Sequence, residues 1–248
     1  MKAIILGAGY GSRLGELTKD IPKNLLDVNG KTILERQIEK FKNCGIEEIV
    51  VIVGPNKQKY QIRDVKYVVD THFDDHEQLS SLMVAKDDIK NEVIISFADI
   101  LIDDEIMKQI VESSQEIGIA IDLDWKLNYE GRTQHPVSEA DLVWIQNNNI
   151  REIKKNLLKR DGGETGEFLG MIKLDYKGSE EFVKRYELLE DSHEGEFQNS
   201  KSFQKGYLTD MLQDLIYAGI QVKPIFVHGK WCEIDTLQDL EIARKKFK

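Results

Sequence analysis

The sequence predicts an α/β fold in which helices cover both faces of a parallel sheet. In the first half, short apolar runs typical of buried strands alternate with helical stretches, and this alternation indicates a parallel sheet. The expected strands are Lys2–Leu6, Glu48–Val53, Lys66–Val69, Glu92–Phe97 and Ile117–Leu123. The expected helices are Thr32–Asn43, about Gln78–Asp87 and Asp104–Ser114. The first strand stops at a glycine-rich loop, and ligands of such sheets bind at the carboxyl ends of the strands.

The second half of the chain alternates less regularly. Two strand-like runs, Leu142–Gln146 and Ile150–Lys154, flank three asparagines and predict a hairpin. Further strands are expected at Glu167–Leu174 and Val222–Val227, and helices at about Ser179–Leu189, Tyr207–Ala218 and Thr236–Lys246. The polar segments 125–140 and 190–205 are expected to be loops over the ligand site. No clean boundary divides the chain, so one domain over residues 1–248 is expected.

Composition and charge exclude several classes of protein. With 41% hydrophobic and 31% charged residues, the 248-residue chain can build a core and stay in solution. Its formal net charge of −10 disfavours nucleic acid or an anionic membrane surface as a partner. Cys44 and Cys232 are far apart and form no CxxC motif, which predicts reduced, buried thiols in a cytoplasmic protein. Neither a signal peptide nor an apolar run of about 18 residues is seen, so no membrane insertion is expected.

The glycine-rich loop after the first strand is the most informative segment. Gly7, Gly9 and Gly11 allow backbone N–H groups to approach a phosphate or a base, and Arg13 and Lys23 supply positive charge. The third glycine comes one residue too early for a dinucleotide fingerprint, and no G-K-[ST] follows for a P-loop. The glycines alone also fit an ordinary strand-to-loop turn.

The order G-x-G-x-G-x-R, then P-K, then VNGKTIL is more specific. It resembles the signature of nucleotidyltransferases that load sugar phosphates or phosphocholine onto a nucleotide. The sequence departs from it at Gly7, where alanine is usual, and at Glu16, where proline is common. The resemblance implies a Rossmann-like three-layer α/β/α sandwich with a mixed, mostly parallel sheet and an acceptor-binding insertion. It also implies a nucleotide-binding half, about 1–123, and an acceptor-binding and closing half, about 124–248.

Two carboxylates and two cations are candidates for catalysis. Asp99 ends a buried strand and can face a ligand crevice, although such a residue is often a turn or a helix cap. Asp235 stands before Thr236 and can be a helix N-cap. Its segment, Trp231–Leu240, also resembles that of phosphocholine- and phosphonate-type cytidylyltransferases. The resemblance implies that Asp99 and Asp235 bind Mg²⁺, that Lys23 contacts the transferred phosphate and that Arg13 holds the leaving pyrophosphate.

The same resemblance implies a nucleotide site. Its expected residues are Leu6, Gly7, Ala8, Gly9, Gly11, Gln78 and Ser81. Gln78 lies where related enzymes read the base, but a surface glutamine near a helix start has the same appearance. Ser81 and its neighbour Ser80 can also serve only as helix caps.

A segment rich in polar and aromatic residues, DWKLNYEGRTQHPVSEAD, is a candidate for the acceptor site. It resembles a segment of nucleotidyltransferases found with phosphonate-making mutases. Trp125 and Tyr129 are expected to hold a choline-like cation and Arg132 a phosphonate, or the segment is a packed loop with its aromatic residues in the core. Lys155, with Lys154 as the alternative in register, is expected at the acceptor's phosphate. Glu167 is expected to accept a hydrogen bond from an amine.

Two other clusters do not point to a site. His72 and His76 are four residues apart, but the residues between them do not make HExxH and no third ligand is evident, which favours a surface loop over a zinc site. The acidic residues 103–105 are typical of the first turn of a helix, where the helix dipole favours negative charge.

The sequence therefore predicts an Mg²⁺-dependent cytidylyltransferase. It would transfer CMP from CTP to a small phosphonate or phosphate monoester, such as 2-aminoethylphosphonate, hydroxyethylphosphonate or phosphocholine, and release pyrophosphate. The alternatives are a sugar-1-phosphate nucleotidyltransferase using UTP or dTTP, and a non-catalytic, nucleotide-binding regulatory subunit. The preference for CTP rests on resemblance. Many proteins of this kind are homodimers, but no apolar stripe in this sequence decides the oligomeric state.

Overall fold

The computed structural model describes residues 1–9, 11–158 and 161–248. The first part of the chain makes a parallel half-sheet. Its strand order is β6 (Val93–Phe97), β1 (Lys2–Gly7), β4 (Glu48–Val53) and β5 (Lys66–Val69). These strands match the predicted runs to within one residue at each end. They lie side by side with the same direction, so their carboxyl ends share one edge of the sheet.

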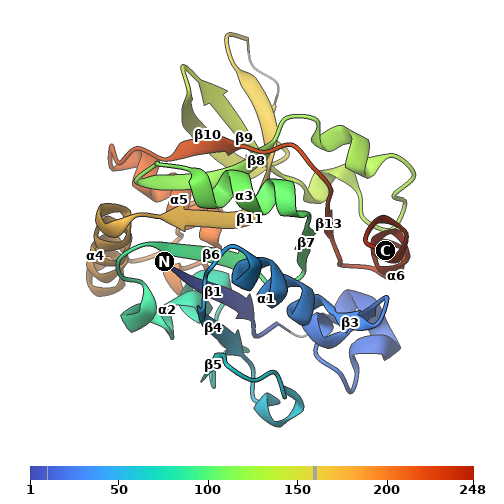
Figure 1. Cartoon of the computed structure of the whole chain (residues 1–248). Helices are drawn as coiled ribbons and strands as arrows, with labels where there is room; N and C mark the ends of the chain where they lie inside the picture. The colour runs from blue at the N-terminus through green and yellow to red at the C-terminus, as the bar shows by residue number, and fades with distance from the viewer. Residues whose placement is uncertain (10, 159–160) are drawn as a thin grey trace.

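Alternating side chains of β1 explain the layers on either side. Ile4 packs toward α2 (Gln78–Met83), α4 (Tyr176–Ser192) and α5 (Leu208–Tyr217) on one face. Ala3 and Ile5 pack toward α1 (Ile33–Asn43) and α3 (Asp104–Glu112) on the other. Figure 1 shows α1 and α3 in front of the sheet. Since both faces of the strand are buried, its sequence is continuously apolar, and the predicted three-layer arrangement is confirmed.

An antiparallel half-sheet follows around the long strand β11 (Glu164–Leu174). It pairs antiparallel with β6, with β8 (Ile117–Asp122) and with β9 (Asp141–Gln146). The predicted hairpin is present as β9 and β10 (Asn149–Lys155), and β12 (Lys223–Phe226) runs parallel to β8. The sheet is mixed, as predicted, but parallel pairing predominates only in the first half.

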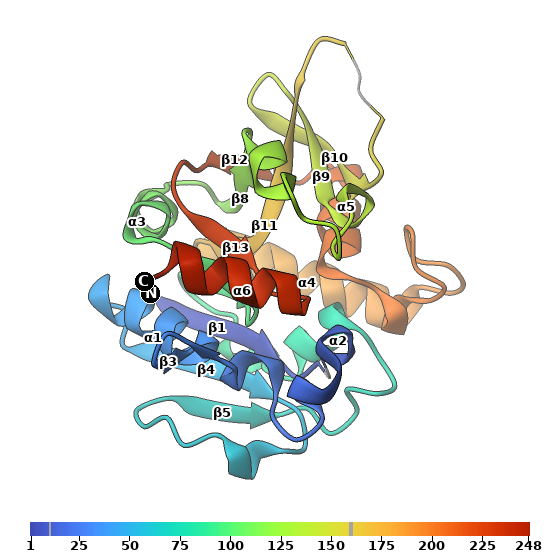
Figure 2. The same ribbon diagram turned by 90° about the vertical axis from the view of Figure 1, so that its right-hand side faces the viewer.

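Four short strands were not predicted, and two of them matter for the site. β7 (Ile100–Ile102) and β13 (Trp231–Glu233) form an antiparallel ribbon in which Ile100 is opposite Glu233. The ribbon continues into a hydrogen bond of 3.0 Å from the Ile234 N–H to the Asp99 carbonyl. A second ribbon, β2 (Asp27–Val28) with β3 (Lys31–Thr32), lies beside α6 (Leu237–Lys246) in both views (Figures 1 and 2).

The residues that cap two helices correct one prediction and confirm another. Thr236, not Asp235, caps α6, because its side chain accepts the Asp239 N–H. Asp103 caps α3, with acidic residues in the following turn, as predicted. The helix expected over Gln78–Asp87 already ends at Met83.

Both cysteines are free, with Cys232 buried and Cys44 partly exposed. Among the described helices, none has both the length and the apolar character needed to cross a bilayer.

Candidate active site

A cavity of about 1040 Å³ opens at the carboxyl edge of the parallel strands. Residues from both ends of the chain form its wall. They include Leu6, Gly7, Gly9, Gly11, Arg13, Lys23, Gln78, Asp99, Lys154, Lys155, Glu233 and Asp235. The sheet edge brings the glycine loop beside Asp99, because β1 and β6 are parallel neighbours. The β7–β13 ribbon then brings Asp235 to the same place.

Lys23 lies between the two candidate metal ligands. Its ammonium Nζ donates to Asp99 Oδ2 at 2.8 Å and to Asp235 Oδ1, and 12% of its side chain is exposed. Arg13 Nη2 is 2.8 Å from Asp235 Oδ2. Asp99 and Asp235, which are 136 positions apart in the chain, thus meet through one shared cation.

The charges in this cluster stabilise one another. Burial alone would lower the pKa of Lys23, but Asp99 and Asp235 raise it above its ordinary value. Burial alone would raise the pKa of Asp235, but Lys23 and Arg13 hold it below the usual range. Burial, together with Asp235 and Asp99, raises the pKa of the neighbouring Glu233 well above normal. The cluster therefore keeps Lys23 as an ammonium and Asp235 as a carboxylate.

The residues around Lys23 fit a divalent cation. Asp99 Oδ1 is buried and has no hydrogen-bond partner among the described residues. Ligand atoms of His135, Glu233 and Asp235 lie within 4.8 Å of one another. Carboxylate oxygens are the protein ligands that Mg²⁺ prefers. Glu233 and His135 were not predicted as ligands, although Glu233 belongs to the segment that singled out Asp235.

The glycine loop is fitted closely to the side chains beneath it. A Cβ at Gly7 would stand 2.3 Å from the Asn24 side-chain nitrogen, so the buried Asn24 occupies the space that the more usual alanine would need. Gly11 has φ +64°, and a Cβ there would stand 2.8 Å from the Lys23 Cβ. The loop thus approaches Lys23 because it carries no side chain at Gly11.

Gly11→Ala is expected to reduce turnover at least tenfold, because the new methyl group displaces Lys23. Gly30→Ala is the matched control: Gly30 also has positive φ, at +85°, but a Cβ there would meet nothing within 4 Å. Both variants carry backbone strain, so thermal unfolding of Gly30→Ala measures the loss that positive φ alone causes. Equal activity in the two variants would show that the Gly11 contact with Lys23 is unimportant.

Four of the residues expected at the acceptor lie behind the cavity wall instead. Trp125 packs edge-on against Tyr129, whose hydroxyl donates to Glu167 at 2.5 Å. Arg132 Nε donates to Asp239 Oδ1 at 2.8 Å, and both side chains are almost fully buried. This agrees with the alternative of a packed segment and not with direct acceptor contact. Sequence could not decide between them, because a ligand pocket and a buried polar network use the same residue types.

Arg132 instead supports the site from behind. Its partner Asp239 accepts the backbone N–H of Asp235 at 3.2 Å and that of Thr236 at 2.9 Å.

The remaining predicted residues lie partly in the cavity wall and partly outside it. Gln78, Lys154 and Lys155 line the cavity, whereas Ser81 is buried in α2 and Ala8 is half-buried, and neither is among the described lining residues.

Comparison with known proteins identifies the family. Residues 3–165 match the MobA-like NTP transferase domain. The chain belongs to this family. Over 99% of its length, this NTP transferase is 31% identical to the whole of the CTP:phosphoglutamine cytidylyltransferase of Campylobacter jejuni. Over 42% of its length, it is 35% identical to 44% of the 2-aminoethylphosphonate cytidylyltransferase of Lancefieldella rimae.

A solved structure confirms the fold of this NTP transferase. The CTP:phosphocholine cytidylyltransferase of Streptococcus pneumoniae superposes with a TM-score of 0.72, covering 100% of this chain and 99% of the other at 24% identity. At that identity the likeness establishes the Rossmann-like α/β fold and nothing about the substrate.

Proposed function

We propose that the protein is an Mg²⁺-dependent cytidylyltransferase, which transfers CMP from CTP to a small acceptor bearing a phosphate or a phosphonate. The observation that carries this proposal is the cluster of Lys23, Arg13, Asp99 and Asp235 beside the glycine loop. The names of the relatives support CTP as the nucleotide.

In the proposed reaction, an anionic oxygen of the acceptor attacks the α-phosphorus of CTP. The bond to the bridging oxygen of the β-phosphate breaks, and pyrophosphate leaves with that electron pair. No general base is required, because the attacking oxygen is already anionic. Positioning and charge stabilisation therefore account for the rate.

The cationic residues contact the phosphates, and the carboxylates hold the metal ion. Backbone N–H groups of the glycine loop hold the triphosphate, Lys23 stabilises the charge on the α-phosphate, and Arg13 holds the departing pyrophosphate. A magnesium ion held by Asp99 and Asp235, with Glu233 beside them, would neutralise phosphate charge. Asp239 and Arg132 keep Asp235 in place from behind.

The acceptor end of the cavity combines both signs of charge. Lys155 reaches Glu139 at 2.8 Å and is available to an acceptor phosphate at the cavity wall. Asp141 also lines the cavity, and its carboxylate has no hydrogen-bond partner among the described residues. We propose that the acceptor carries an amine that pairs with Asp141, as a phosphorylated or phosphonylated amino compound would.

Asp141→Asn is expected to raise KM for 2-aminoethylphosphonate by about tenfold, the cost of one hydrogen bond to a charged group. KM for 2-hydroxyethylphosphonate, which lacks the amine, should stay unchanged. Burial raises the pKa of Asp141 to about 6; Lys155 opposes this, while Asp210 and Glu139 add to it. A carboxyl with a raised pKa gains its proton as pH falls, so the amine substrate should bind more weakly below about pH 6. An equal loss with both substrates would contradict the assignment.

Pyrophosphate release tests the proposal as a whole. Four nucleotides would be combined with phosphoglutamine, 2-aminoethylphosphonate, 2-hydroxyethylphosphonate, phosphocholine and glucose-1-phosphate, with and without Mg²⁺. Release with CTP and a phosphate or phosphonate acceptor, only when Mg²⁺ is present, supports the proposal. Release with UTP or dTTP and glucose-1-phosphate would identify a sugar nucleotidyltransferase instead. Absence of turnover with all combinations would contradict the proposed activity.

A further inference from the structure

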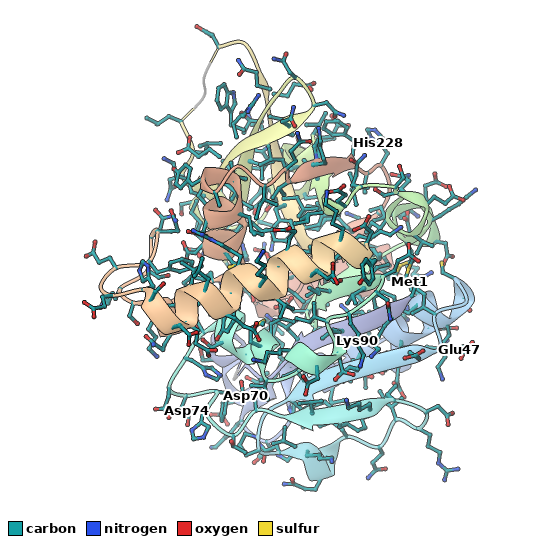
Figure 3. The ribbon with its side chains drawn as sticks, turned by 90° about the vertical axis from the view of Figure 1, so that its left-hand side faces the viewer. Met1, Glu47, Asp70, Asp74, Lys90 and His228 are labelled. Carbon is teal, nitrogen blue, oxygen red and sulfur yellow. The ribbon has the colours of Figure 1, made fainter. Side chains whose placement is uncertain are left out.

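The loop between β5 and α2 holds a histidine that the proposed reaction does not use. Asp70, directly after β5, is completely buried. Its Oδ1 accepts the backbone N–H of His72 at 3.1 Å, and its Oδ2 is 2.7 Å from His76 Nε2. Figure 3 labels Asp70 and Asp74 at the end of the sheet opposite to Glu47 and Lys90, which precede strands. The histidine therefore lies at the carboxyl edge, where sheets of this kind bind their ligands.

This loop lies against the glycine loop. A Cβ at Gly54, after β4, would stand 3.2 Å from the Ala8 carbonyl and 4.0 Å from the Phe73 ring. His76, Phe73 and Gln78 line the same cavity as Gly9 and Gly11. The wall at this end is thus made of glycine backbone on one side and of an imidazole, a ring and an amide on the other. Such a combination suits a planar heterocyclic base.

The buried carboxylate determines what the imidazole offers to a ligand. In the neutral ring, the bond to Asp70 places the proton on Nε2 and leaves Nδ1 as an acceptor. Nδ1 has no partner in the part of the chain that the structure describes. The exposed fraction of the His76 side chain is 13%, so few orientations are open to it.

We propose that His76 selects cytosine, by accepting a hydrogen bond from the 4-amino group of the base at Nδ1. This inference rests on the proposed function, since it takes a cytidine nucleotide as the substrate. Uracil presents an oxygen acceptor at the same position, so it would leave Nδ1 facing another acceptor. Asp70 is then a positioning residue that fixes which ring nitrogen carries the proton.

Two variants separate this role from simple packing. His76→Ala removes the acceptor and should weaken CTP binding at least fivefold with little change for UTP. In Asp70→Asn, the amide oxygen should still accept the hydrogen bond from the His72 N–H. The NH₂ group of the amide then faces Nε2 of His76. The ring proton must then move to Nδ1, which becomes a donor, so preference should shift toward UTP. His72→Ala is the control, because 76% of that side chain is exposed and, among the described residues, its ring pairs only with Asp75.

The measurement is the dissociation constant of each protein for CTP and for UTP by titration calorimetry, with thermal unfolding to confirm folding. We expect the CTP-to-UTP selectivity of the wild type to fall in His76→Ala, to reverse or vanish in Asp70→Asn and to persist in His72→Ala. Unchanged selectivity in a folded His76→Ala protein would overturn the inference, and so would a wild type that binds both nucleotides equally. Selective CTP binding without pyrophosphate release from any acceptor would defeat the proposed function and leave this inference standing.

Discussion

Asp99→Asn and Asp235→Asn should each lower pyrophosphate release by roughly 10³-fold or more while the protein stays folded. The amide is nearly the same size as the carboxylate but carries no charge, so it cannot balance a divalent cation or the Lys23 ammonium. The measurement is steady-state turnover at saturating nucleotide and acceptor over a range of Mg²⁺ concentrations. If a metal is held there, the residual activity should need far more Mg²⁺ than the wild type does.

The control for both variants is Asp104→Asn. Asp104 pairs with Lys40 at 2.6 Å, but 76% of its side chain is exposed and it lies at the start of α3. That variant should keep wild-type activity, because exposed ion pairs contribute little. Near-normal turnover in both Asp99→Asn and Asp235→Asn would show that the metal site lies elsewhere.

Lys23→Met should reduce turnover by roughly 10²-fold or more, as expected when a charge contact is lost from the transition state. It should also change the response to metal. Without the ammonium, Asp99 and Asp235 lose the cation that they share, and their mutual repulsion lowers the stability of the metal-free protein. A bound divalent cation relieves this repulsion, so Mg²⁺ should raise the unfolding temperature of the variant more than that of the wild type.

Thermal unfolding with and without Mg²⁺ checks the second effect, and pyrophosphate release checks the first. Lys31→Met is the control, because Lys31 pairs with Glu39 near the surface. An unfolding temperature that is indifferent to Mg²⁺ in Lys23→Met, together with normal turnover, would remove Lys23 from the proposed chemistry.

Much of the fold was readable from the sequence because the signals are local. The buried strands Lys2–Gly7 and Glu48–Val53 are apolar runs in the sequence, and α1 has a helical period. The carboxyl edge followed from parallel pairing alone. The glycine loop, Arg13 and Lys23 were found because their spacing is confined to a short stretch.

The remainder depends on partners that are distant in sequence. β7 and β13 have three residues each, and only their mutual pairing makes them strands. Arg132 looked like a phosphonate ligand because its neutralising partner, Asp239, lies 107 positions away. Tyr129 and Glu167 are likewise 38 positions apart. A single sequence cannot show whether a polar side chain is satisfied by the protein or left for a ligand.

His76 illustrates the same limit at short range. Its spacing from His72 suggested a zinc site, and the sequence analysis rejected that site because no third ligand was evident. The partner that orients the His76 ring is Asp70, which lies six positions earlier, directly after a strand. An acidic residue that ends a strand and is followed by a histidine in the next loop was a usable signal.

The β7–β13 ribbon has a consequence for the order in which the protein is made. The ribosome delivers the glycine loop, Lys23 and Asp99 before Asp235, within the span 3–165 that matches the family model. Asp235 follows Asp99 by 136 positions, so it emerges later and reaches Asp99 when β13 docks on β7. A nascent or prematurely terminated chain can therefore bury much of the parallel half-sheet and still lack one of the two carboxylates. Under the proposed mechanism, catalytic competence would thus wait for the segment that carries Asp235.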